Sequence, residues 1–289
     1  MTALQNNRLG ILLMVATTFV FAVQDGLSRH LAGEYNVFMV VMVRYWFFAA
    51  FVMSVTARHA GSLRAAAATA QPGLQALRGL LLAAEICVVV TGFVRLGLVE
   101  SHAVFASYPL IAAALSGPVL HERVGWMRWS AILVGFIGIL VILRPGAHVF
   151  SPDALIPLVG ATMFALYGLL TRYVARRDSA ASSFFWTGTM GAVFMTAVGI
   201  WHWQPMSGGD WGWMALLCVT GVFGHWLLIR CYEVAEVSAV QPFAYLQLVF
   251  ASTIGVTVFH ETLEPQVVAG GAIVVLAGLF TLWRESRLG

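Results

Sequence analysis

Two stretches that lie half a chain apart decide the fold. The first is Ala22-Val-Gln-Asp-Gly-Leu-Ser-Arg-His-Leu31, and the second is Ala165-Leu-Tyr-Gly-Leu-Leu-Thr-Arg-Tyr-Val174. They share alanine, leucine and arginine at equivalent positions, and serine in one corresponds to threonine in the other. A second pair of landmarks, Val119-Leu-His-Glu122 and Val258-Phe-His-Glu261, has nearly the same spacing, 139 residues against 143. The sequence therefore predicts an internal duplication.

The composition places both copies in a membrane. The chain has 289 residues, of which 60% are hydrophobic and only 10% are charged, and its mean hydropathy is +0.85. A soluble domain is about a quarter charged, so a soluble fold of this composition would have too little polar surface to face water. At about 20 residues per transmembrane helix, the chain has room for ten helices and short loops. We expect an all-α polytopic membrane protein.

Apolar runs between turn and charge signals predict ten transmembrane helices. They are Leu9–Ser28, Val37–Ala57, Leu74–Val94, Ser101–Leu120, Trp126–Leu143, Ala154–Val174, Ser183–Trp201, Trp211–Arg230, Ser238–Phe259 and Pro265–Trp283. Arg8 and the apolar run after it are interpreted as an uncleaved first helix and not as a signal peptide. The duplication then divides the chain into two five-helix repeats, residues 1–146 and 147–289.

The arginines give these helices a direction. All 16 basic residues are arginines, and positive residues accumulate in cytoplasmic loops. With the N-terminus inside, 12 arginines fall on the cytoplasmic side and three on the outer side. Both termini are therefore predicted to be cytoplasmic. Because each repeat has an odd number of helices, the second repeat must enter the membrane from the opposite side. Such inverted repeats are typical of secondary transporters.

The sequence resembles the EamA-type members of the drug/metabolite transporter superfamily. The resemblance rests on the two halves, on Arg95-Leu-Gly-Leu-Val-Glu-Ser101, and on Glu122 and Glu261 after the fourth and ninth helices. The glycine-rich fifth and tenth helices, with Gly135-Phe-Ile-Gly138 and Gly270-Gly271, also fit. It implies ten helices around a central cavity, lined by the first, third, fourth, sixth, eighth and ninth. It also implies export of small metabolites, with YddG-type exporters of aromatic and other neutral amino acids as the nearest match.

Polar and aromatic residues near the middle of those helices are the candidates for substrate binding. They are Tyr108, Gln247, Tyr245, Tyr167, Phe164 and Gln24. The alternative for the tyrosines is packing, with each hydroxyl bonded to a neighbouring helix. Pro109 and Pro242 lack a backbone donor and are expected to bend the fourth and ninth helices.

Ionisable groups within the membrane are costly and mark functional sites by default. Asp25, Arg44, Glu85 and His225 are in this class. One interpretation is structural: Asp25 pairs with Arg29 one turn away, or Arg44 pairs with Asp25 or Glu85 across helices. The other is that Asp25 or Glu85 binds a substrate amine or a coupling proton. His225 is open to either a packing or a titrating role.

These observations together predict a secondary transporter of the bacterial inner membrane that exports amino acids by alternating access. The alternative substrate is a drug or another cationic compound. Phosphorylated substrates are disfavoured because lysine is absent and Arg44 is the only deep arginine. An enzyme is not expected, because neither Gly-x-Ser-x-Gly nor paired metal ligands occur in the spans; a receptor or scaffold would usually carry a soluble domain. We expect no cofactor, no metal and no nucleic acid, and a monomer or homodimer in the lipid bilayer.

Overall fold

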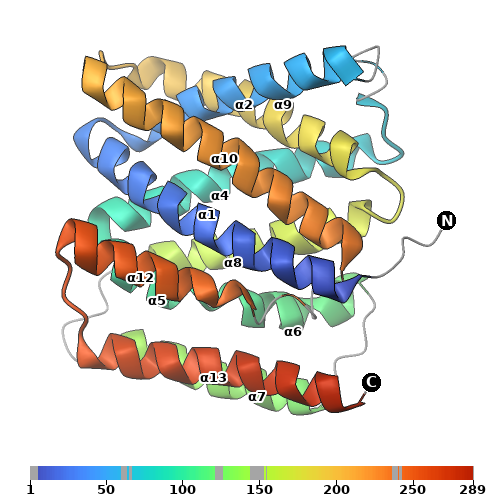
Figure 1. Ribbon diagram of the computed structural model, residues 1–289, viewed down its shortest axis with the longest axis vertical. Helices are drawn as coiled ribbons and strands as arrows, with labels where there is room; N and C mark the ends of the chain where they lie inside the picture. The colour runs from blue at the N-terminus through green and yellow to red at the C-terminus, as the bar shows by residue number, and fades with distance from the viewer. Residues whose placement is uncertain are drawn as a thin grey trace.

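The computed structural model describes residues 6–59, 64, 67–120, 126–143, 153, 155–235, 240 and 243–288. Within them, every extended regular element is a helix (Figure 1). The first half contains α1 (Asn7–Glu34), α2 (Val37–His59), α4 (Pro72–Leu96), α5 (Leu98–Phe105), α6 (Tyr108–Leu120) and α7 (Trp126–Leu143). The second half contains α8 (Leu155–Val174), α9 (Ala180–Gly199), the 3₁₀ turn η2 (Ile200–His202), α10 (Gly208–Val234), α12 (Leu246–Phe259) and α13 (Pro265–Leu288).

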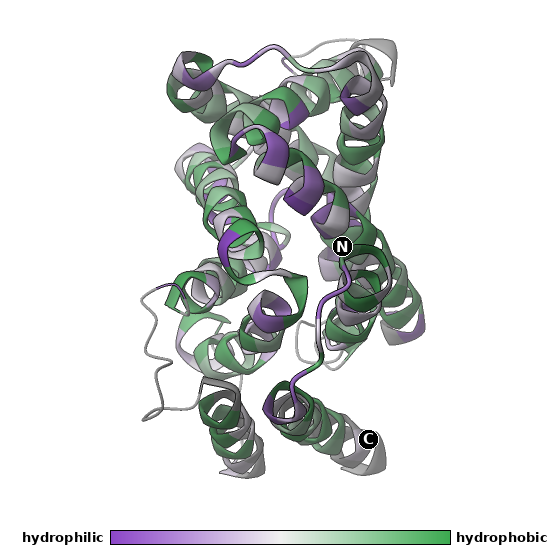
Figure 2. Ribbon diagram, turned by 90° about the vertical axis from the view of Figure 1, so that its left-hand side faces the viewer, coloured by the Kyte–Doolittle hydropathy of each residue, from purple (hydrophilic) through white to green (hydrophobic). Residues whose placement is uncertain are grey.

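The predicted all-α membrane architecture is confirmed. In the described part of the chain, seven helical segments are long and apolar enough to span a membrane, and α12 and α13 carry shorter apolar stretches. Each of the ten expected spans overlaps at least one helix. Figure 2 shows long hydrophobic stretches along these helices, interrupted by a small number of hydrophilic positions. The chain is thus a multi-pass membrane protein.

The fourth expected span is not one continuous helix. It is divided into α5 and α6, with a turn at Ala106 and Ser107. Pro109 contributes to this break, because its ring nitrogen has no hydrogen and leaves the carbonyl of Phe105 without its i+4 donor. As a result, Tyr108 begins α6. α12 begins at Leu246, later than the expected Ser238. Glu122 and Pro242 lie outside the described residues.

The packing of the helices follows the internal duplication. In the first half α1 packs against α10 and α12, and in the second half the corresponding helix α8 packs against α4 and α6. Equivalent helices also pair with each other: α2 lies against α9 at one end of the long axis, and α7 against α13 at the other (Figure 1). Exchanging the two halves therefore preserves these helix pairs. The boundary between the repeats near residue 146 stays a prediction.

The first and last helices place the two chain ends at the same side of the molecule. α1 begins and α13 ends at the same side in Figure 1, as an even number of crossings requires. Close helix contacts hold this bundle together. At the α2–α9 contact, a side chain on Gly191 would overlap the ring of Tyr45, so a residue without Cβ allows these helices to approach.

Candidate functional site

A small cavity lies where the two halves of the bundle meet. Its volume is about 30 Å³, room for about one or two water molecules and roughly a tenth of an ordinary ligand pocket. Side chains from α1, α2, α4, α5, α8, α10 and α12 line it, namely Phe21, Gln24, Asp25, Arg44, Glu85, Ile86, Val89, Val90, Phe93, Phe105, Phe164, His225 and Gln247. The structure therefore represents a state closed around its centre. Each of the six spans expected to line the cavity contributes at least one residue to it, and α2 adds Arg44.

Arg44 is the positive group of the cavity. Its side chain comes from α2 and is buried. Nη2 donates to Oε1 of Gln24 at 3.0 Å and lies 3.1 Å from Nε2 of His225. Because an arginine nitrogen can only donate, Nε2 of His225 must be the acceptor and the proton of the neutral ring lies on Nδ1. Nδ1 has no hydrogen-bond partner among the described residues.

Glu85 supplies a carboxylate to the same cavity. It comes from the middle of α4, is 3% exposed, and makes no hydrogen bond to another residue within the described ranges. The side-chain oxygen of Gln247 is likewise buried there without a donor. Buried polar groups are usually paired. The cavity thus combines a cation, Arg44, with two acceptors that can receive a donor from a ligand.

Asp25 is held by a different set of groups. Its Oδ2 accepts a hydrogen bond from Nε2 of Gln247 at 2.9 Å and lies 3.1 Å from Nε2 of His102. The ring of His102 is buried and stacks on Phe93, with 4.8 Å between the ring centroids. The Nδ1 atom of His102 is 3.0 Å from the carbonyl oxygen of Leu98. Asp25 and His102 thus connect α1 to α5 beside the cavity.

The structure separates the six substrate-binding candidates into two groups. Gln24, Phe164 and Gln247 line the cavity, whereas Tyr108, Tyr167 and Tyr245 are buried and do not line it. The hydroxyl of Tyr167 accepts a hydrogen bond from Arg78 at 3.2 Å. Tyr108 packs against Phe105 and Phe164, and Tyr245 packs with Ala106 and Leu110. The three tyrosines therefore occupy the positions of packing residues.

The four ionisable candidates, Asp25, Arg44, Glu85 and His225, all line the cavity. The expected ion pairs among them are not formed in the described structure, which is a correction. Asp25 contacts His102 instead of Arg29 or Arg44, and Arg44 bonds to Gln24 and His225. Arg44 is thus bonded to Gln24 and His225, and Asp25 to Gln247 and to His102, which the sequence analysis did not select.

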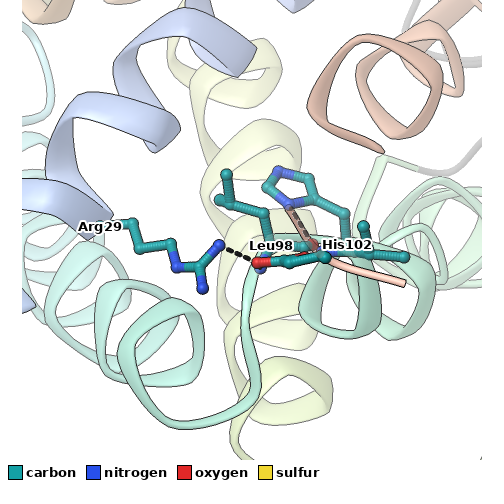
Figure 3. Close-up of polar contacts among 5 residues, drawn as sticks. Arg29, Leu98 and His102 are labelled. Carbon is teal, nitrogen blue, oxygen red and sulfur yellow. Dashed lines mark hydrogen bonds and ion pairs between the residues drawn. The ribbon is translucent and has the colours of Figure 1, made fainter. Parts of the chain in front are cut away.

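One end of the bundle is held by a group of residues that we call the Glu261 cluster: Arg29, Leu98, Val99 and Glu261. Glu261 follows α12 and accepts hydrogen bonds from the backbone N–H of Leu98 at 2.9 Å and of Val99 at 2.8 Å. It also forms an ion pair with Arg29. In Figure 3 the side chain of Arg29 reaches from α1 toward the start of α5, where Leu98 and His102 lie. A carboxylate at a helix N-terminus is favourable because it satisfies free N–H groups.

The opposite end is held by a second group, the Arg78 cluster: Gln75, Arg78, Tyr167, Asp178 and Ser183. Arg78 is fully buried in α4. It donates to Gln75, to the hydroxyl of Tyr167 on α8 and to the carbonyl of Ser183 on α9. Gln75 in turn donates to Asp178 at 2.9 Å. The two clusters lie at opposite ends of the cavity-lining helices, so each joins several helices at its own end.

His102 and Arg78 are buried polar residues near the cavity that the sequence analysis did not select, and Phe21, Phe93 and Phe105 are lining residues that it did not select. The sequence did carry a signal for His102, because it is a histidine at the start of an apolar span (residues 101–120). Arg78 was assigned to the cytoplasmic arginines that orient the chain, although it lies inside the expected third span. Its burial depends on polar partners from α8 and α9, which no local pattern reveals.

Comparison with known proteins identifies the family. The EamA-like transporter family matches residues 8–144 and, separately, residues 153–283. An S-adenosylmethionine uptake transporter of Rickettsia prowazekii is 26% identical over 96% of this chain and 94% of its own length. A riboflavin transporter of Vibrio cholerae is 32% identical over 64% of this chain and 63% of its own length.

A solved structure supports the fold. A protein whose crystal structure is known, 15% identical to this chain, superposes with a TM-score of 0.70 over 96% of this chain and 98% of its own. At this identity the likeness concerns the fold alone. The family match covers nearly all of the described helices and agrees with their duplicated packing around one cavity. The chain therefore belongs to the EamA-like transporter family and is a membrane transporter, not an enzyme.

Proposed function

We propose that this transporter moves small metabolites that carry an α-amino-acid head group, by alternating access through the central cavity. The observation that carries the proposal is the pair of opposite charges at the cavity: Arg44 from α2 and Glu85 from α4. An α-amino acid presents a carboxylate and an ammonium group on the same carbon. Arg44 would receive the carboxylate, and Glu85 with the free oxygen of Gln247 would receive the ammonium.

The hydrogen bonding of Arg44 supports its role. Both hydrogen bonds of its guanidinium within the described part of the chain start from Nη2. Nη1 and Nε make no hydrogen bond within the described part of the chain, and the planar guanidinium favours two-point contacts with a carboxylate. Phe21, Phe93, Phe105 and Phe164 surround these groups and would contact the apolar or aromatic remainder of a substrate.

The relatives carry different substrates, so they support a proposal about the amino-acid head group and not about one compound. S-adenosylmethionine, the substrate named for the Rickettsia transporter, is a methionine derivative with an amino-acid head, a sulfonium charge and an adenine ring. Free neutral or aromatic amino acids share that head. Riboflavin, named for the Vibrio relative, has no such head and is the second candidate, because the phenylalanine rings suit its flat ring system. The sequence analysis predicted export of the substrate, whereas the Rickettsia relative is named an uptake transporter.

The test is counterflow in proteoliposomes, which requires no knowledge of direction or coupling. Vesicles loaded with one unlabelled compound receive the same labelled compound outside. The compounds are S-adenosylmethionine, phenylalanine, leucine and riboflavin. We expect label to enter for S-adenosylmethionine or an amino acid. Counterflow of riboflavin alone would reject the head-group proposal.

Variants at the two charges distinguish recognition of the head group from recognition of a simple cation. Arg44→Gln should raise the KM for any substrate with a carboxylate, because one charge-assisted contact contributes about 1.5–3 kcal/mol, equivalent to about 10- to 150-fold. It should leave a cation without a carboxylate, such as a quaternary ammonium dye, unaffected. Glu85→Gln should weaken both. Loss of dye flux in Glu85→Gln with amino-acid flux intact would favour the cationic-drug alternative.

A further inference from the structure

We infer that Asp25 and His102 together form a proton-binding site that couples transport to a proton, and that this site is joined to the Glu261 cluster. The inference rests on the proposed transport function for its physiological meaning. The geometry of the pair stands independently of the substrate. His102 bridges two acceptors on different helices: the carboxylate of Asp25 on α1 and the carbonyl of Leu98 at the start of α5.

A hydrogen bond from His102 to the carbonyl of Leu98 requires a hydrogen on Nδ1 of the ring. A carbonyl oxygen can only accept, so the 3.0 Å contact between it and Nδ1 is a hydrogen bond only if Nδ1 carries hydrogen. Nε2 then faces Oδ2 of Asp25 at 3.1 Å. If both atoms were unprotonated, two lone pairs would face each other in a buried site. Both ring contacts are hydrogen bonds at the same time only if the pair holds a second proton, on Nε2 of an imidazolium or on Oδ2 of the acid.

Asp25 is the one titratable side chain that bonds to the ring of His102 in the described structure. The elements that pack against α5 carry these titratable or charged residues with described side chains: Arg8, Asp25, Arg29, His30 and Glu34 on α1; Arg78, Glu85, Cys87 and Arg95 on α4; Tyr167, Arg172 and Tyr173 on α8; Tyr245, His260 and Glu261 beside α12; and Glu264 before α13. Glu100 lies on α5 itself. Among the described side chains, only Asp25 forms a hydrogen bond with the ring of His102. The other donor to Asp25 is the uncharged amide of Gln247.

Loss of the proton has a defined structural consequence. The step transfers one proton from the Asp25–His102 pair to water, giving hydronium, a neutral ring with one hydrogen, and a carboxylate. The ring then has one hydrogen for two acceptors, so its contact to Asp25 or its contact to Leu98 is lost. Leu98 takes part in both contacts: its N–H is bound by Glu261 and its C=O by His102 (Figure 3). Deprotonation therefore weakens the same end of the bundle that the Glu261 cluster closes.

The coupling test uses the substrate found by counterflow. With one proton moved per substrate, a gradient of one pH unit changes the steady-state accumulation ratio about tenfold. We expect wild-type vesicles to show this change and His102→Gln vesicles to show an accumulation ratio near one while retaining counterflow. Retained counterflow shows that the variant is folded. A tenfold change that persists in His102→Gln would overturn the proposal.

His202→Gln is the matched control. The Nδ1 atom of His202 lies 3.1 Å from the carbonyl of Val198 four residues earlier, which is the arrangement of His102 and Leu98. His202 is exposed and is not in the cavity lining. We expect this variant to couple as the wild type does. Loss of coupling in His202→Gln as well would attribute the effect to general histidine loss and reject the specific site.

A second measurement needs no substrate and separates this inference from the proposed function. ¹⁵N NMR of histidine-labelled protein in lipid, as the difference between wild type and His102→Gln, reports the two ring nitrogens of His102. We expect Nδ1 protonated and Nε2 protonated or sharing a proton, with the Nε2 signal changed in Asp25→Asn. A bare Nε2 at neutral pH would overturn the proton site. Absence of flux for every compound would instead reject the proposed function.

Discussion

Asp178 shows how a single carboxylate stabilises one end of the bundle. It lies between α8 and α9, outside the membrane-spanning helices, and accepts hydrogen bonds from Thr69, the N–H of Ala70 and Gln75. Burial alone would raise the pKa of Asp178, but these bonds, with the charge of Arg78, lower its pKa below the usual value. The folded pKa is thus lower than the unfolded one. Its contribution is fully present above about pH 4 and is lost as pH falls through the lowered pKa.

Asp178→Asn tests this contribution. An amide has one acceptor oxygen in place of two, so it cannot pair with all three donors, Thr69, Ala70 and Gln75, and we expect a loss of about 1–3 kcal/mol at neutral pH. The difference from wild type should shrink below about pH 4, because the wild-type carboxylate is then protonated as well. Thermal unfolding in detergent at several pH values measures it. Asp153→Asn is the control, since Asp153 pairs with Arg95 at an exposed site and such pairs contribute about 0–1 kcal/mol. A stability difference between wild type and Asp178→Asn that does not change with pH would contradict the stabilising role of the Asp178 carboxylate.

At this scale the sequence predicted residue types better than their partners. Asp25, Arg44, Glu85 and His225 were selected because charge is costly in a membrane, and all four line one cavity. Their hydrogen-bond partners could not be predicted, because every partner found lies on another helix. The ring of His102 contacts Asp25 77 residues away, and only the packing of α1 against α5 brings them together.

The junction between α4 and α5 depends on a glycine. Gly97 has φ +88° and ψ 171°, a region that is essentially restricted to glycine. A Cβ there would also lie 2.7 Å from Oε1 of Glu261. We expect Gly97→Ala to destabilise the protein by about 1–3 kcal/mol. Gly33→Ala in α1, where a Cβ meets nothing within 4 Å, should be neutral or stabilising. Thermal unfolding measures the stability of both variants. Equal losses of stability would reject a specific requirement for glycine at position 97.

A glycine on α10 sets the position of Arg44. A Cβ on Gly221 would lie 2.7 Å from Nε of Arg44, the flexible end of a long side chain. We therefore expect Gly221→Ala to change stability by less than about 1 kcal/mol and to raise the KM for the transported compound by displacing the guanidinium. Gly212→Ala on the same helix has open space around its Cβ and should leave KM unchanged. An unchanged KM in Gly221→Ala would show that Arg44 tolerates the shift.

The elements themselves were largely predictable, and their irregularities were not. Long apolar runs between arginines and turn residues specify transmembrane helices because the bilayer requires internal backbone bonding. α8 begins one residue from its expected start at Ala154 and ends at the expected Val174. The break between α5 and α6 occurs within a continuous apolar run, so hydrophobicity gives no sign of it. Pro109 indicated a bend, but the sequence did not indicate that the turn falls at Ala106 and Ser107.

For the whole molecule, the exchange of equivalent helices agrees with an inverted duplication, and the arginine count predicts its direction. Gln204, before α10, and Ala68, before α4, lie in exposed segments at opposite ends of α2. We expect Gln204→Cys to react with a membrane-impermeant thiol reagent in intact cells, and Ala68→Cys only after permeabilisation. The parent chain, whose Cys218 and Cys231 are buried, gives the background. The reverse pattern would invert the predicted topology.

The two clusters predict opposite effects on access to the cavity. Alternating access requires that opening one end excludes opening the other, and the cavity here is closed with polar contacts at both ends. A Val89→Cys reporter lines that cavity. Adding Glu261→Gln weakens the end predicted to face outward, so labelling from outside should rise; a loss of about 1.4 kcal/mol would correspond to tenfold in population. Adding Asp178→Asn weakens the opposite end and should lower labelling. If both variants raised labelling, the clusters would stabilise the fold without controlling access.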